Sequence, residues 1–205
     1  MKYLISLYAV LGLEEGAPES ELKTAFDALK SRLSIDHFPE GSIARSQAEK
    51  GLKAIENAFH TLTKPELRSL YEEQRKEYVK GEKQGESRPR LGQLCVASGM
   101  ITMEQLKEAV DMQHKMDLPL GEVLQAKQFI SQAELDGLLL GQEMIDVPSA
   151  VTDPLGLRLV SLGLVSEDMV LIAQMEKRTQ GRTMDDLLVR HGWVDPDVMS
   201  ALLSS

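Results

Sequence analysis

The feature that most constrains this chain is a unit of two short helices joined at a glycine. In its first copy Leu91 and Leu94 share one helix face. Gly99 follows where a helix needs a left-handed stop, which glycine adopts without a Cβ clash. Thr102 and Gln105 then fit a capping box at the start of the next helix. This stretch predicts a helical hairpin.

The unit recurs three more times, each time with two apolar residues before a capping residue. The four expected N-caps are Thr102, Ser131, Ser166 and Asp195. Copies one and three are 64 residues apart, and so are copies two and four. The repeat is therefore a pair of copies, and the pair is itself duplicated.

Composition favours helices in the rest of the chain as well. Of the 205 residues, 42% are hydrophobic but only 4% are aromatic, and ten are Met. A core of Leu, Met, Ala and Val suits helices better than sheets. The single Cys95 cannot form an internal disulfide, so we expect a buried thiol and a reducing compartment. The fold class expected is all-α.

The first 13 residues are apolar enough to resemble a signal peptide, but Glu14 and Glu15 follow at once and no small-residue cleavage site appears. No apolar run approaches the roughly 20 residues of a spanning helix. We expect a cytoplasmic protein without membrane insertion.

Net negative charge is concentrated in the C-terminal part of the chain. Residues 1–89 carry a net charge of −1 and residues 90–205 a net charge of −8. Nonspecific nucleic-acid binding needs a basic field, so no nucleic-acid partner is expected. The four histidines share no metal-ligand spacing and the chain lacks a Gly-x-x-x-x-Gly-Lys-Ser/Thr loop. We therefore expect no catalytic residue, no metal and no cofactor.

The N-terminal part predicts four helices, over residues 5–11, from Pro18, from Ser42 and from near Lys64. Thr63 is expected to cap the last of them, with Leu67, Leu70 and Tyr71 turned inward. Three segments of this part are Tyr8-Ala-Val-Leu-Gly-Leu, Ala17-Pro-Glu-Ser-Glu-Leu-Lys-Thr-Ala-Phe and Ala54-Ile-Glu-Asn-Ala-Phe-His-Thr-Leu-Thr-Lys-Pro-Glu-Leu-Arg-Ser-Leu-Tyr71. Over residues 5–72 this layout resembles the J-domain of DnaJ-type co-chaperones.

The resemblance implies a particular functional loop, and the sequence departs from it. The family places His-Pro-Asp after the second helix, where it activates a DnaK-type ATPase. Here the aligned residues are Ser34, Ile35 and Asp36. We expect a J-like fold used as a docking surface, with a chaperone partner not expected. The candidate partner-binding residues are Lys23, Lys30, Ser34, Asp36 and His37.

Copies one and two are similar to a 24-residue pattern in the MshE-type N-terminal domain of type II secretion and type IV pilus ATPases. In that family two tandem patterns bind cyclic di-GMP. In such a site we expect the Arg either to stack on a guanine or to bind a phosphate bidentately. The resemblance implies a ligand site at Arg90, Leu91, Gly92, Val96, Gly99, Leu106, Gln113, Leu120, Gly121, Leu124 and Gln142. In copy two, Pro119 stands where the pattern has Arg, and Gln128 stands where it has the central Gly. Copies three and four keep the residues that indicate the fold but not those that indicate a ligand.

The expected organisation is a J-like domain over residues 1–78, a polar linker over 79–89, and secretion-ATPase N-terminal-like modules over 90–147 and 148–205. The expected function is a non-catalytic signalling adaptor that binds cyclic di-GMP through the first module, with a protein partner in secretion, pilus or motility machinery. Two alternatives stay open. One is an interaction scaffold without a small ligand, and the other is an active co-chaperone of a DnaK-type chaperone.

Overall fold

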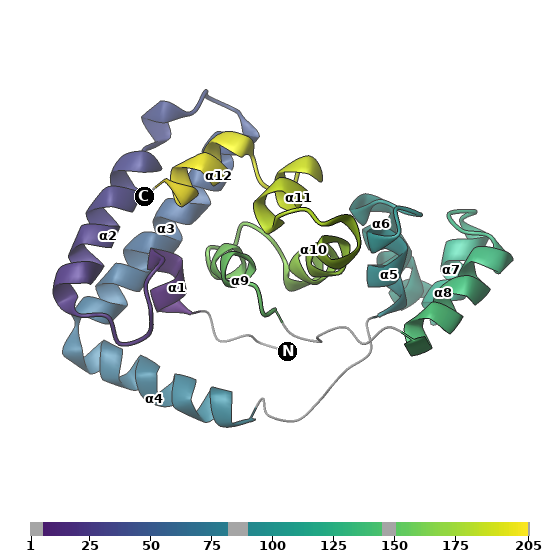
Figure 1. The fold of residues 1–205 in the computed structure, drawn as a ribbon, viewed down its shortest axis with the longest axis horizontal. Helices are drawn as coiled ribbons and strands as arrows, with labels where there is room; N and C mark the ends of the chain where they lie inside the picture. Colours follow the sequence, from purple (N-terminus) through teal and green to yellow (C-terminus); the bar gives the residue numbers. More distant parts are fainter. Residues whose placement is uncertain (1–5, 82–89, 145–150, 205) are drawn as a thin grey trace. The chain divides into compact units, whose positions relative to one another are not determined.

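The computed structural model describes residues 6–81, 90–144 and 151–204. Every regular element in these ranges is a helix, which confirms the all-α prediction (Figure 1). Two compact units form, one from the described parts of residues 1–85, 151–170 and 183–205, and the other from those of 86–150 and 171–182. The module boundaries expected from the sequence stay predictions.

The first unit begins with the helices of the J-like region. They are α1 (Leu7–Leu11), α2 (Glu19–Arg32), the 3-10 turn η1 (Ile35–His37), α3 (Ile43–Thr63) and α4 (Pro65–Gly81). Helix α3 packs against α1, α2 and α4. Tyr8, Leu22 and Ile55 are among the most buried side chains of this unit. The ring of Phe26 stacks on that of Phe59, with 4.2 Å between the two ring centroids. The core is therefore organised around the longest helix.

Three expectations about this region were wrong in detail. Pro18 is the N-cap of α2 and not its first residue. Thr63 ends α3, where its hydroxyl donates to the Phe59 carbonyl, so it does not cap α4. Leu67 and Leu70 are 37% and 54% exposed, because Tyr71 supplies the buried contact of this turn of α4. The spacing of apolar residues predicted the helix correctly, but it assigned too many residues to the buried face of that helix.

The first unit also contains the last helices of the chain. They are α9 (Pro154–Ser161), the start of α10 (Glu167–Gln180), α11 (Met184–Arg190) and α12 (Pro196–Leu203). Helix α9 packs against α1, and α12 packs against both α2 and α3 (Figure 1). Helices α1, α2 and α3 thus pack against helices that lie more than 100 residues later in the sequence.

The second unit is built from α5 (Leu91–Ala97), α6 (Met103–Met116), α7 (Leu120–Ala126), α8 (Gln132–Met144) and the end of α10. Helix α5 packs against α8, and α6 against α7, so each copy of the repeat pairs with its neighbour. The expected linker over residues 79–89 and the side chain of Gln142 lie outside the described residues, apart from the end of α4 at Gly81.

The fourfold repeat predicted from the sequence is confirmed by the backbone. The residue three positions before each N-cap has a positive φ in every copy, at Gly99, Gln128, Gly163 and Gly192. In each copy the next residue donates its N–H to a carbonyl five residues back, as at Met100 to Cys95 (3.0 Å) and Trp193 to Leu188 (3.0 Å). These are the paired bonds of a Schellman motif, which satisfies carbonyls at the helix end.

The predicted N-caps are confirmed as well. Thr102 and Gln105 form both bonds of a capping box, at 3.2 and 2.8 Å. The Ser131, Ser166 and Asp195 side chains each accept a backbone N–H from the first turn of their own helix. Local hydrogen bonding therefore starts and stops all four helix pairs at the positions that the sequence specifies.

Candidate functional site

The connection between α2 and α3 is the first candidate surface. Ser34 precedes the turn η1 with φ −51° and ψ 127°, and its carbonyl accepts the His37 N–H at 3.0 Å. Asp36 and His37 are exposed, while Phe38 is buried and holds the end of the loop in the core. The structure thus places Ser34, Asp36 and His37 together on one anchored turn.

The basic candidates lie on α2 beside this turn. Lys23 and Lys30 are exposed and seven residues apart, so they lie on the same side of the helix, two turns from each other. Lys30 pairs with Glu56 of α3 at 3.3 Å, and its ammonium lies 5.4 Å from the centroid of the Phe26 ring. Both partners of the pair are more than half exposed, so solvent screens it and a binding partner can displace it at little cost.

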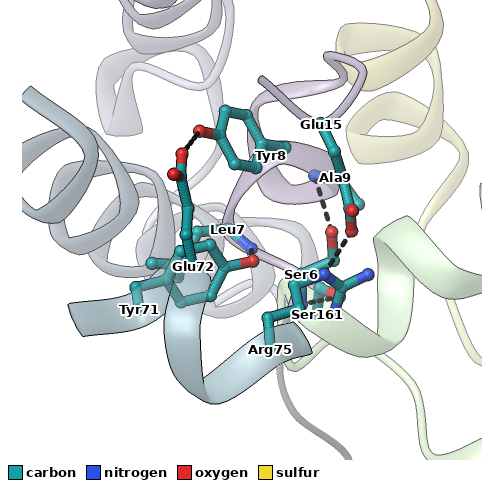
Figure 2. Close-up of polar contacts among 9 residues, drawn as sticks. All are labelled: Ser6, Leu7, Tyr8, Ala9, Glu15, Tyr71, Glu72, Arg75 and Ser161. Carbon is teal, nitrogen blue, oxygen red and sulfur yellow. Dashed lines mark hydrogen bonds and ion pairs between the residues drawn. The ribbon is translucent and has the colours of Figure 1, made fainter. Parts of the chain in front are cut away.

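A polar network joins α1 to α4 and was missed by sequence reasoning (Figure 2). The Tyr8 hydroxyl donates to Glu72 at 2.7 Å, and the Leu7 N–H donates to the Tyr71 hydroxyl at 3.0 Å. Burial, followed by the hydrogen bond to Glu72, raises the pKa of Tyr8 to about 12. The Tyr8 and Glu72 side chains meet only in the folded state, so periodicity gives no signal for this pair.

The same network fixes the loop between α1 and α2. Arg68 donates to Glu72 at 3.0 Å and to the Ala17 carbonyl at 3.0 Å. Arg75 pairs with Glu15, and the Ser6 N–H reaches the Ser161 hydroxyl at 3.3 Å (Figure 2). The bonds of Arg68 and Arg75 thus attach the α1–α2 loop to α4, and the Ser6 bond attaches the start of α1 to α9.

The two Leu-Gly turns of the second unit form the other candidate surface. A Cβ on Gly92 would lie 3.3 Å from Leu120 Cδ2, and one on Gly121 would lie 3.6 Å from Leu91 Cδ2. The starts of α5 and α7 therefore face each other reciprocally. The candidate residues of copies one and two at these turns therefore lie close to each other, while the ligand site itself stays a prediction.

Inside this arrangement the apolar candidates are already used for packing. A Cβ on Gly92 would lie 2.5 Å from Leu106 Cδ1, and one on Gly121 would lie 3.2 Å from Leu135. The buried candidates are Gly92, Val96, Leu106, Gly121 and Leu124; Leu91, Gln113 and Leu120 are half-buried, and Arg90 and Gly99 are exposed. Both glycines thus admit a leucine from the following helix of their own copy, and Arg90 is the accessible cation of the set.

Cys95 and the His, Cys, Asp and Glu side chains are the candidates for nucleophilic or metal chemistry in the described residues. Cys95 is fully buried, and burial raises the pKa of its thiol to about 11, far from that of a reactive thiolate. Over residues 6–81, 90–144 and 151–204 no group of three or more His, Cys, Asp or Glu side chains is placed to hold a metal ion. None of the helices described here has the length and apolarity to cross a membrane.

Comparison with known proteins agrees with the geometry of the first unit. Residues 6–72 match the family model described as "DnaJ domain". The chain is 36% identical over 66 residues to "Chaperone protein DnaJ" of Clostridium botulinum (strain Eklund 17B / Type B), covering 32% of this chain and 17% of that protein.

Two further relatives give the same result. "Chaperone protein DnaJ" of Sinorhizobium medicae (strain WSM419) and "Protein NolC" of Rhizobium fredii are each 36% identical over 66 residues, covering 32% of this chain and 16% of the relative. The chain thus spans about a sixth of the length of these relatives, and no solved structure matches it. The resemblance of residues 90–205 to secretion-ATPase modules stays a prediction. Over residues 6–72 this chain is therefore similar to a DnaJ domain, both in sequence and in its order of helices.

Proposed function

We propose that this protein is a non-catalytic adaptor that docks on a DnaK-type chaperone through its DnaJ domain without activating the chaperone's ATPase. The DnaJ-domain match makes a chaperone the first partner class to test, although the sequence alone did not lead us to expect one. The observation that carries the proposal is the loop between α2 and α3. The four-helix scaffold is intact, yet Ser34-Ile35-Asp36 occupies the place of the activating tripeptide.

The loop geometry makes this proposal directly testable. Ser34 has a ψ of 127°, within the range that a residue preceding proline prefers. Ile35 is the first residue of the turn, a position that suits proline because the N–H there is not needed inside the turn. The double substitution Ser34→His with Ile35→Pro therefore creates His-Pro-Asp at a position where the turn tolerates proline.

The test is single-turnover ATP hydrolysis by a DnaK-type chaperone, with the wild-type protein and with this double variant. We expect no acceleration from the wild type and a clear acceleration from the variant. Ser34→Ala with Ile35→Pro is the matched control, since it makes the same backbone change without the imidazole. Acceleration by the wild type would make the protein an active co-chaperone and would refute the proposed adaptor role.

A second candidate function is cyclic di-GMP binding by the second unit. What favours it is the reciprocal approach of the Gly92 and Gly121 turns, with Arg90 exposed beside them. Calorimetric titration with cyclic di-GMP tests it, with Arg90→Ala as the variant and Arg182→Ala as a control at another exposed arginine of the same unit. Binding that Arg90→Ala weakens supports a signalling adaptor. No heat from the wild type leaves these turns with a packing role alone.

A further inference from the structure

Comparison of the four copies of the repeat singles out Arg158. The corresponding positions in the other copies hold Leu94, Val123 and Leu187, which are 6%, 1% and 1% exposed. Copy three places an arginine where the repeat otherwise buries an aliphatic side chain. Replacing a core aliphatic residue by a cation is costly unless the cation makes specific contacts, so the contacts of Arg158 indicate what this copy has specialised for.

Arg158 lies on α9 and contacts both the end of α1 and the end of α12. Its Nη1 donates to the Leu202 carbonyl at 3.0 Å. Its guanidinium carbon lies 2.9 Å from where a Cβ on Gly12 would be, so the guanidinium group lies directly against the end of α1. Nearby, Arg32 of α2 donates to the Ser204 carbonyl. Two guanidinium groups therefore hold the C-terminal end of α12, where positive charge is favourable.

Gln47 of α3 binds the backbone at the other end of α12. The Gln47 amide nitrogen donates to the Trp193 carbonyl at 3.0 Å, and its oxygen accepts the Asp195 N–H at 2.9 Å. Since Asp195 is the N-cap of α12, Gln47 binds the backbone at the start of that helix. Helix α12 is thus held at its start by α3 and at its end by α2 and α9.

The face that α12 presents differs from that of the corresponding helices in copies one and two. Val198 is fully buried in copy four, and the corresponding residues of copies one and two are Gln105 and Glu134, the polar members of their capping boxes. Copy three also has an apolar residue at this position, Met169. Val198 thus adds apolar contact to α12, whereas Arg158 differs in kind from its counterparts in all three other copies.

We propose that α12 is a removable cover on the α2–α3 side of the DnaJ domain, and that it limits access of an external partner to that side. The claim that α12 limits access rests on the proposed function, whereas the claim that α12 can detach does not. Helix α12 has only eight residues, too few to be stable alone. Its attachment also carries a penalty, because Arg158 Nε is buried without a hydrogen-bond partner among the residues that the structure describes. Burial, followed by repulsion from Arg32, lowers the pKa of Arg158.

The cover is tested by hydrogen exchange on the full-length protein. In the wild type we expect amides of α12 to exchange at least about tenfold faster than the core amides of α3, because α12 opens by itself. The variant Gln47→Ala with Arg158→Leu, which restores the aliphatic residue of the repeat, should speed exchange in α12 by about a further tenfold and leave α3 unchanged. Acrylamide quenching of Trp193, the only tryptophan, should rise in parallel.

Two controls keep this result interpretable. Arg190→Leu makes the same substitution at an exposed position of α11 and should leave exchange in α12 unchanged. If the double variant does not fold, exchange in α12 is measured in Gln47→Ala alone. Exchange of α12 and α3 amides at the same rate in the wild type would show that they open together, and would overturn the cover.

Access is tested by measuring the affinity of a DnaK-type chaperone for the same proteins. The released variant should bind about tenfold more tightly than the wild type and Arg190→Leu. Equal affinity, with α12 shown to be released, would overturn the claim that the helix limits access. If neither protein binds the chaperone, the proposed function is rejected, and the exchange experiment still decides whether α12 is a cover.

Discussion

Gln128 occupies a backbone position that the other three copies of the repeat assign to glycine. Its φ is +59°, against +75°, +71° and +70° at Gly99, Gly163 and Gly192. A left-handed residue with a Cβ is disfavoured by about 1–2 kcal/mol, and the extra freedom of an unfolded glycine offsets part of this. Because the Gln128 side chain is exposed, little else changes. Gln128→Gly should therefore stabilise the second unit by about 0.5–1 kcal/mol.

Cys95 provides the assay, since it lies in the same unit and is fully buried. A thiol reagent labels it only when the unit opens, so the labelling rate follows the opening equilibrium. A gain of about 0.5–1 kcal/mol should slow labelling of Gln128→Gly about two- to fivefold.

Gly99→Ala is the matched control for this experiment. A Cβ at Gly99 meets nothing within 4 Å, so the substitution changes backbone strain without a steric clash. Labelling should become about five- to thirtyfold faster, corresponding to a loss of about 1–2 kcal/mol. Unchanged or faster labelling in Gln128→Gly would refute the argument that the turn at this copy is strained.

Three further predictions concern packing and titration. Gly156→Ala should destabilise the first unit by about 1–3 kcal/mol in urea unfolding, since its Cβ would lie 2.3 Å from the stiff Val170. Gly137→Ala, with open space around it in α8, should stabilise the second unit by about 0.5–1 kcal/mol in the thiol-labelling assay. The pKa of Cys95 rises from 9.0 in the unfolded chain to about 11 in the folded one, so the thiol's contribution to stability is complete below pH 9 and is lost as the pH rises through 11. The difference in stability between wild type and Cys95→Ala should follow that window in pH-dependent unfolding, and a difference independent of pH would contradict the assignment.

Local patterns in the sequence predicted the helix pairs well because local hydrogen bonds build them. The capping box of Thr102 and Gln105 and the left-handed stop at Gly99 depend only on residues a few positions apart. They therefore appear in the sequence as short motifs with fixed spacing.

Contacts between distant segments could not be predicted in the same way. Gln47 meets Asp195 across 148 residues, and Tyr8 meets Glu72 across 64. Neither pair leaves a periodic trace. Leu70 failed for a related reason, since an amphipathic pattern shows that a helix has an apolar face without showing how much of that face another helix covers.

Arg158 shows what comparison within the chain could still have added. Its departure from Leu94, Val123 and Leu187 is visible in the amino-acid sequence alone once the four copies are aligned. The signal is a position at which one copy has a charged residue and the other three have a buried aliphatic residue. What that arginine contacts, however, depends on how α9 packs against α1, and that is a property of the fold.

The most direct test of the proposed function is the binding of a DnaK-type chaperone to the full-length protein at low salt, measured with and without the exposed cations of α2. We expect micromolar binding by the wild type. Lys23→Glu with Lys30→Glu should weaken it about tenfold, whereas Lys50→Glu with Lys53→Glu, a reversal of the same size on exposed positions of α3, should leave it unchanged. No binding by the wild type, or equal affinity for both charge-reversed proteins, would contradict docking through this surface of the DnaJ domain.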